Sequence, residues 1–289
     1  MITVTPTEAE ELVEINLRAK NVTFLKGSPS TAKSSIVAKI AKKYNLKLID
    51  IRLSQCEPPD LNGMPRINKE KNKAEYVPME TLPIWSDSLP LDHQGNEMAG
   101  WLIFMDEMNG AEDSTQKSSY KVVFDKLVGQ EPLHPNVGIV AAGNLATDNA
   151  LVEELSSALK SRLCTINVRP DTAGFIKFMI GNGFSHEIIS FLEFKPKAHY
   201  TFDPDTVDGV DTYACNRTWM FLDQMFKQLS DPASYKLALP LFTSAVGEGV
   251  AREFIAYLKH FAKLPKMAEI LANPETAVLP KEPGSQYAI

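Results

Sequence analysis

The chain has 289 residues, with 30 basic and 36 acidic side chains, which give a formal net charge of −6. The hydrophobic fraction of 44% and the charged fraction of 23% are those of an ordinary soluble globular protein. This composition excludes collagen-like, disulfide-stapled and wholly disordered chains. The acidic balance argues against a protein whose main task is to coat nucleic acid, because that task needs a basic surface.

The cysteines and the first residues bear on the compartment. Cys56, Cys164 and Cys215 lie far apart and form no C-x-x-C motif, so we expect reduced thiols. Residues 1–14 are acidic and contain no apolar run of signal-peptide length. No apolar stretch in the sequence is long enough for a membrane span. These features predict a cytoplasmic protein with no membrane contact.

The first part of the chain alternates between helix and strand. Residues 7–20 are expected to form a helix that Thr7 could cap. The apolar run at residues 22–25 indicates a buried strand, residues 34–44 a second helix, and residues 46–53 a second strand. A strand, a helix and a strand within about 30 residues form a βαβ unit, which implies a parallel sheet.

The alternation is interrupted at residues 57–90, where prolines are frequent and a short strand is expected at 74–77. We interpret this segment as an insertion with a loop and a small hairpin. Beyond it the pattern predicts three more strands, separated by two helices. The strands are at residues 101–105, 137–142 and 164–168, and the helices at residues 112–127 and 151–161. The sheet is therefore predicted to have five core strands.

Strand signals fade after Pro170, and a polar link follows at residues 195–211. Helices are expected at residues 172–181, 186–194, 217–229, 233–246 and 251–262, with a kink at Pro240 and an irregular tail from residue 273. The predicted domains are an α/β core at residues 1–195 and a helical lid with its tail at residues 196–289.

The loop between the first predicted strand and the second helix reads Gly27-Ser28-Pro29-Ser30-Thr31-Ala32-Lys33-Ser34. It follows the phosphate-loop pattern G-x-x-x-x-G-K-[ST], with alanine in place of the second glycine. In such a loop, backbone N–H groups and the helix N-terminus face the phosphates, the lysine reaches them, and the hydroxyl binds Mg²⁺. The candidate nucleotide-binding residues are Gly27, Ser30, Thr31, Ala32, Lys33, Ser34 and Ser35. The alternative interpretation is a serine-rich helix cap with an exposed lysine.

The apolar strand at residues 101–105 ends in two acids, Asp106 and Glu107. Ligands of open α/β sheets bind at the carboxyl ends of the strands. Asp106 could hold Mg²⁺ together with Ser34, because Mg²⁺ prefers few carboxylates and several waters. Glu107 could polarise an attacking water. The alternative is a pair of acids that enter a solvated loop.

The phosphate loop and the strand-end Asp-Glu pair together resemble the AAA+ ATPases. Ala141-Ala142-Gly143-Asn144 is similar to the sensor 1 motif, and Asn216-Arg217-Thr218 to the sensor 2 motif. Leu159-Lys160-Ser161-Arg162-Leu163 stands where the family has its arginine finger. Asp60-Leu61-Asn62-Gly63 followed by a hairpin insertion looks most like the MoxR branch. The family usually carries glycine where Ser30 and Ala32 stand.

This resemblance implies a five-stranded parallel P-loop NTPase core with a C-terminal helical lid, which hydrolyses ATP with Mg²⁺. It implies that Asn144 orients the water together with Glu107, and that Arg217 couples nucleotide state to the lid. Arg162, or Lys160 in second place, would act on the nucleotide of the next subunit in a ring, which by resemblance is a hexamer. The ring would remodel or assemble a separate client or adaptor, which in this branch often bears a von Willebrand factor A-type domain.

Other interpretations stay open at this point. Asn144 could be a turn residue, and Arg162 and Arg217 could be ordinary arginines at helix ends. The chain could be an ATP-gated factor associated with nucleic acid, such as a helicase loader or packaging accessory, although its net charge of −6 and the lack of a DNA-binding motif count against this. It could also be an inactive scaffold with an impaired phosphate loop, in which case Ala32→Gly should restore nucleotide binding.

Overall fold

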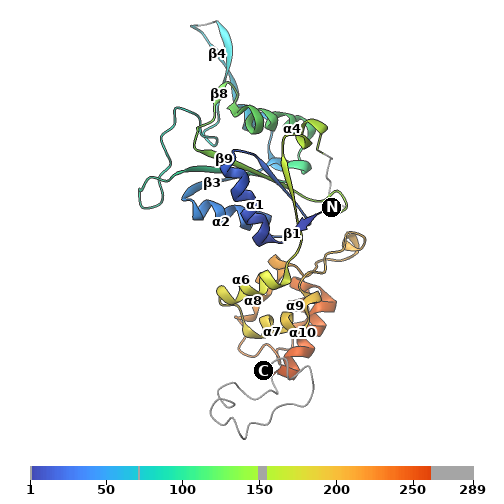
Figure 1. Ribbon diagram of the computed structural model, residues 1–289. Coiled ribbons are helices and arrows are strands. Elements are labelled where there is room, and N and C mark those ends of the chain that lie inside the picture. Colours follow the sequence, from blue (N-terminus) through green and yellow to red (C-terminus); the bar gives the residue numbers. More distant parts are fainter. Residues whose placement is uncertain (1, 71, 149–154, 262–289) are drawn as a thin grey trace. The chain divides into compact units, whose positions relative to one another are not determined.

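The computed structural model describes residues 2–70, 72–148 and 155–261 (Figure 1). The chain forms two compact units, Met1–Arg169 and Pro170–Ile289. This division lies before the boundary expected between residues 195 and 196. The reason is that α6 (Thr172–Gly181) and α7 (His186–Phe194) bury their apolar faces in the core of the second unit, not in the α/β unit.

The first unit is built around a sheet of six parallel strands in the order β1-β10-β2-β9-β6-β3. The strands are β1 (Thr3–Val4), β2 (Thr23–Lys26), β3 (Leu46–Arg52), β6 (Gly100–Asp106), β9 (Val137–Gly143) and β10 (Cys164–Val168). All five predicted core strands are present, and the short edge strand β1 is the sixth. Its two residues pair with Asn167 and Val168, and they are too few to show a periodic pattern in the sequence.

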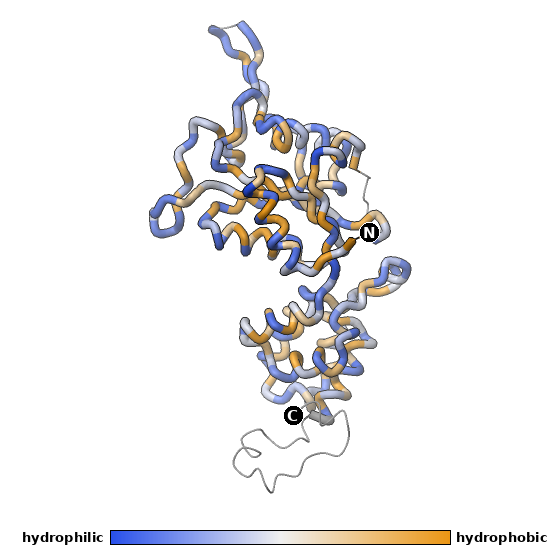
Figure 2. Tube along the Cα trace, in the orientation of Figure 1, coloured by the Kyte–Doolittle hydropathy of each residue, from blue (hydrophilic) through white to orange (hydrophobic). Residues whose placement is uncertain are grey.

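Helices cover both faces of this sheet, as in a P-loop NTPase core (Figure 1). The helices α1 (Pro6–Arg18) and α2 (Lys33–Lys43) pack on one face, against Leu102 and Phe104 of β6. The next residues of that strand, Ile103 and Met105, point to the other face, because successive strand side chains alternate. Figure 2 shows hydrophobic and hydrophilic residues alternating along α1 and α2.

The N-terminal cap of α1 differs from the expectation. Thr5, and not Thr7, precedes the first helical turn, and its hydroxyl accepts a hydrogen bond from the Glu8 backbone N–H. The Glu8 carboxylate in turn accepts from the Thr5 N–H at 2.7 Å, which completes a capping box. Thr7 lies inside the helix because the proline before it, Pro6, is well suited to the first helical position.

The predicted insertion contains α3 (Pro58–Asn62) and an antiparallel hairpin of β4 (Met64–Asn68) and β5 (Lys73–Val77). The helix expected at residues 112–127 ends earlier. It comprises α4 (Asp113–Tyr120) and a π-helical turn at Lys121–Asp125. A second small hairpin follows, with β7 (Leu127–Val128) and β8 (Glu131–Pro132), which the sequence did not indicate. The helix expected at residues 151–161 begins outside the described residues, and α5 (Ser157–Lys160) is its described part.

The second unit is helical. Besides α6 and α7 it contains α8 (Asn216–Phe226), α9 (Ala238–Val246) and α10 (Glu248–Phe261), around a core that includes Phe191, Trp219 and Phe254. Pro240 does not kink a longer helix, because α9 begins at Ala238 and the proline falls in its first turn, where a backbone N–H has no intrahelical partner. The tail expected from residue 273 lies outside the described residues. No described helix is both long and apolar enough to cross a bilayer.

Candidate functional site

The loop between β2 and α2 places two residues that are not glycine in the left-handed region of backbone conformation. Ser30 and Ala32 adopt left-handed conformations, with φ of 59° and 68°. These are the two positions where the AAA+ pattern has glycine. Residues that alternate into the left-handed region turn successive backbone N–H groups toward one concave side, which suits an anion. The loop therefore keeps the required shape without glycine, at a cost of about 1 kcal/mol or more per residue.

We expect Ala32→Gly to stabilise the protein by about 1 kcal/mol, because relief of left-handed strain outweighs the added chain entropy. The rise in unfolding temperature would be about 2–4 °C. Ala38→Gly is the matched control, since Ala38 is exposed within the same helix and the same substitution there should destabilise by about 1 kcal/mol. Equal destabilisation by both variants in thermal unfolding would contradict the strain argument.

Lys33 lies inside this loop, and its side chain is buried. Its ammonium donates to the carbonyl oxygens of Gly27 at 2.6 Å and Ser28 at 3.1 Å, and to Asn144 Oδ1 at 3.2 Å. Asn144 follows β9, which is the neighbour of β2 in the sheet. The sheet order thus brings the predicted sensor 1 residue to the phosphate-loop lysine, although the two are 111 residues apart.

The residues expected to hold Mg²⁺ also lie together. The Ser34 hydroxyl, in the first turn of α2, is 3.4 Å from Asp106 Oδ2 at the end of β6. Asp50, on the neighbouring strand β3, is a further acid at this edge. Partial desolvation of this otherwise exposed carboxyl and the negative charge of Asp106 raise the pKa of Asp50 above its usual range. A hydroxyl and a carboxylate at hydrogen-bonding distance form the kind of sparse oxygen site that Mg²⁺ accepts.

Glu107 has an unusual backbone conformation. Its φ of 55° is left-handed, and its N–H donates to Asp106 Oδ1 at 2.9 Å. The Ser54 hydroxyl, in the short helical turn after β3, donates to Glu107 Oε2. A non-glycine residue in this conformation costs of order 1–3 kcal/mol and persists where surrounding contacts hold it, often at functional sites. The acid is therefore held in one orientation at the carboxyl edge of the sheet.

Sequence reasoning missed two buried polar side chains that brace this site. Asn109 accepts a hydrogen bond from the Asn144 N–H at 3.2 Å and donates to the Asn144 carbonyl at 2.9 Å. Asp148 accepts from the Ser28 hydroxyl at 3.1 Å and from the Leu145 N–H at 3.2 Å. Burial raises the pKa of the Asp148 carboxyl. Both follow predicted motifs by only a few residues, but a polar residue near a strand end gives no signal of where its side chain points.

Two glycines allow the close approach of these strand ends. A Cβ on Gly27 would lie 2.5 Å from the Val168 carbonyl oxygen, and one on Gly143 would lie 2.1 Å from Asn109 Oδ1. Thr31 is buried beside Gly27, and its hydroxyl donates to the Ser28 carbonyl at 2.9 Å. Ser35, the last of the predicted nucleotide-binding residues, is exposed in the first turn of α2.

The predicted arginines are on other elements of the chain. Arg162 is exposed just after α5, with its guanidinium 5.2 Å from the centroid of the Phe124 ring. Lys160, the second candidate for the finger, is also exposed, at the end of α5. Arg217 is exposed in the first turn of α8, in the second unit. The finger and sensor 2 roles of these residues stay predictions.

Comparisons with known proteins add little to this geometry. No family model matches the sequence, and no curated protein matches it. Among solved structures, the chain is similar to one from Cytophaga hutchinsonii that is provisionally assigned as an ATPase. The identity is 17%, the match covers 97% of this chain and 79% of that one, and the TM-score is 0.43. So distant a likeness identifies neither a family nor an activity, and the functional argument rests on the site itself.

Proposed function

We propose that this protein is a MoxR-like AAA+ ATPase that binds and hydrolyses ATP with Mg²⁺ and uses the energy to remodel or assemble a partner protein. The observation that carries the proposal is the juxtaposition of Ser34 and Asp106, 3.4 Å apart, at the foot of a loop with the phosphate-loop conformation. The loop, the lysine, the strand-end acids and the polar residue after the adjacent strand are present in one unit.

In this proposal the backbone N–H groups of residues 30–34, with Ser35 beside them, bind the phosphates, and Lys33 neutralises part of their charge. Its ammonium must turn from the Gly27 and Ser28 carbonyls toward the phosphates. Ser34 and Asp106 would hold Mg²⁺, which neutralises charge on the β- and γ-phosphates. The described residues contain no cluster of three or more His, Cys, Asp or Glu side chains fit to bind a metal.

Glu107 is the proposed base. Its carboxylate polarises a water and accepts a proton from it as the water attacks the terminal phosphate, while the bond from that phosphorus to the bridging oxygen breaks and ADP leaves. Asn144 orients that water through its side-chain amide, and the buried Asn109 holds the Asn144 backbone in place. The bond between Lys33 and Asn144 connects the phosphate loop directly to this residue, so that a change at the phosphates alters the position of Asn144.

Arg162 is proposed to act on the nucleotide of a neighbouring subunit, and the chain to assemble as a ring, with six subunits by resemblance. The exposure of the Arg162 side chain supports this role, since a residue that serves a neighbour must reach the surface. Arg217 would relay nucleotide state to the helical unit. The partner is a separate client or adaptor, which by resemblance could bear a von Willebrand factor A-type domain.

A mixture of two inactive variants tests whether two neighbouring subunits share one active site, here called the shared site. Arg162→Ala and Glu107→Gln should each abolish turnover alone, because each removes one half of every interface. In a ring of randomly mixed subunits, about one quarter of the interfaces combine an intact glutamate with an intact arginine, so turnover should reappear at that level. Size measurements with and without ATP and Mg²⁺ show whether each variant assembles. Full activity of Arg162→Ala, or assembled mixtures that remain inactive, would exclude the shared site, and Lys160→Ala tests the second candidate.

A further inference from the structure

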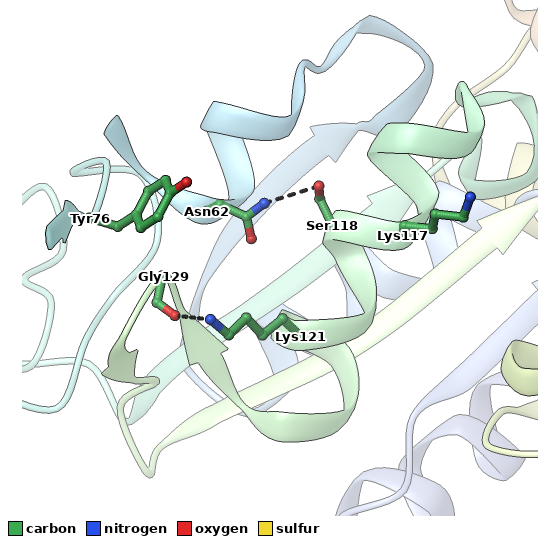
Figure 3. Close-up of a pocket in the computed structure, with 6 residues that line it drawn as sticks. All are labelled: Asn62, Tyr76, Lys117, Ser118, Lys121 and Gly129. Carbon is green, nitrogen blue, oxygen red and sulfur yellow. Dashed lines mark hydrogen bonds between the residues drawn. The ribbon is translucent and has the colours of Figure 1, made fainter. Parts of the chain in front are cut away.

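A pocket of about 370 Å³ lies at the foot of the β4–β5 hairpin, away from the phosphate loop (Figure 3). Its wall combines the end of α3, β5, α4 with the π-helical turn after it, and the turn between β7 and β8. The lining residues are Asn62, Tyr76, Lys117, Ser118, Lys121 and Gly129. Two of these six carry an ammonium group and none carries a carboxylate, so the chemistry of the lining favours an anionic group.

Both lysines make contacts that a ligand could replace or add to. Lys117 pairs with Asp113 one helical turn away, and both side chains are about two-thirds exposed, at 65% and 66%. Exposed pairs of this kind contribute about 0–1 kcal/mol, so an incoming carboxylate can replace Asp113 at little cost. Lys121 donates to the Gly129 carbonyl, and an ammonium has three donors. The pocket can therefore present positive charge to a ligand without loss of a strong internal bond.

One face of the hairpin above the pocket is apolar, whereas the other combines charged and apolar residues. Arg66 and Glu75 form an ion pair of 2.6 Å across this mixed face, which also carries Met64 and Val77. Strand alternation and the pairing register place four other residues on the opposite face, which we call the apolar strip: Pro65, Ile67, Ala74 and Tyr76. Ile67 is 73% exposed. Because Tyr76 also lines the pocket, the apolar strip leads directly into it.

Glycine contacts fix the pocket and the hairpin base in position. Gly129, with φ of 60°, lies so close to the insertion that a Cβ there would be 2.6 Å from the Asn62 carbonyl oxygen and 3.1 Å from Tyr76 Cβ. Gly63, with φ of 83°, lies equally close to Val77, where a Cβ would be 2.2 Å from the carbonyl oxygen. The turn between β7 and β8 is therefore in close contact with the base of the hairpin. The site is already formed in the absence of a ligand.

We propose that the pocket and the apolar strip together bind an extended segment of a partner protein in which apolar side chains at alternate positions are followed by an acidic side chain. The apolar side chains cover the strip, and an acidic side chain enters the pocket between Lys117 and Lys121. This pairing matches both features of the surface, because a purely acidic ligand leaves the strip exposed and a purely apolar one brings no charge to the two lysines. The partner's role as the client rests on the proposed function, whereas the binding itself needs no nucleotide.

The test uses fluorescein-labelled peptides of about eight residues, long enough to span the hairpin at ~3.3 Å per residue. Each has Leu at alternate positions with Ser between them, and the three end in Glu-Glu, Gln-Gln and Lys-Lys. Each is titrated into the full chain without nucleotide, with anisotropy as the readout. The Glu peptide should bind at least ~10-fold more tightly than the other two, and rising salt should reduce this preference. Nucleotide binding is measured separately, so a failure here is distinct from a failure of the ATPase proposal.

Variants locate the site. Lys117→Gln with Lys121→Gln should remove the preference for Glu over Gln, while Ile67→Ser should weaken the Leu-containing peptides together. Lys69→Gln, outside the pocket, is the matched control and should change neither, and thermal unfolding checks that each variant is folded. Equal binding of the three peptides, no binding of the Glu peptide, or insensitivity to these variants would overturn the proposal. So would a single-stranded oligonucleotide that competes for the same lysines with higher affinity than the Glu peptide.

Discussion

Replacement of Glu107 by glutamine is expected to lower ATP turnover by about 100-fold or more and to leave nucleotide binding near that of the wild type. Glutamine keeps the size of the side chain, and its carbonyl oxygen can still accept the hydrogen bond from Ser54. It cannot take a proton from the attacking water or carry the negative charge that polarises it. Phosphate release at saturating ATP measures the first effect, and calorimetric titration with ATP and Mg²⁺ the second.

Two further variants sharpen this result. Glu131→Gln removes an exposed acid in the β7–β8 hairpin and should leave turnover unchanged. Ser54→Ala removes the group that holds the Glu107 carboxylate but not the carboxylate itself, so its loss should be smaller than that of Glu107→Gln. Equal turnover in the wild type and Glu107→Gln would rule out Glu107 as the base, and with it the proposed mechanism.

Replacement of Lys33 by methionine is expected to weaken ATP binding by about 10–100-fold, because a hydrogen bond to a charged group contributes about 1.5–3 kcal/mol. Methionine retains the apolar stem but has no ammonium to meet the phosphates. The variant also loses the bonds from Lys33 to the Gly27 carbonyl and to Asn144. Calorimetric titration with ATP and with ADP measures the change, which should be larger for ATP because the lysine reaches the β- and γ-phosphates.

Lys39→Met is the matched control for this experiment. Lys39 lies on the same helix and makes a 2.7 Å ion pair with Glu10, but its side chain is 68% exposed. Loss of the Lys39 ammonium should leave ATP affinity unchanged. Since Lys33 is buried, thermal unfolding of both variants establishes a temperature at which each is folded. Wild-type affinity in Lys33→Met at that temperature would show that this loop is a helix cap and not a phosphate site.

Local sequence patterns were enough to predict most of the elements. The apolar run at residues 101–105 has no internal polar position, and β6 is accordingly a buried interior strand, between β9 and β3. The local patterns failed where contacts between distant parts of the chain set the structure. Two residues are too short for a periodic signal, so β1 was missed. The extent of the second unit was also misjudged, because an amphipathic helix such as α6 shows which face is apolar but not which core that face joins.

The sequence by itself determined which groups make up the candidate site, since a lysine, a hydroxyl and two strand-end acids are recognisable from residue type and spacing alone. Only the tertiary structure decided how these groups meet. The order of the strands places Asn144 beside Lys33, and contacts between distant segments set Asp148 against Ser28. The tertiary structure also decided the backbone conformation of Ser30 and Ala32, which depart from the glycines of the phosphate-loop pattern. Packing around the loop imposes on both the left-handed backbone that glycine would adopt freely, because a local preference of about 1–2 kcal/mol yields to the many contacts of a folded core.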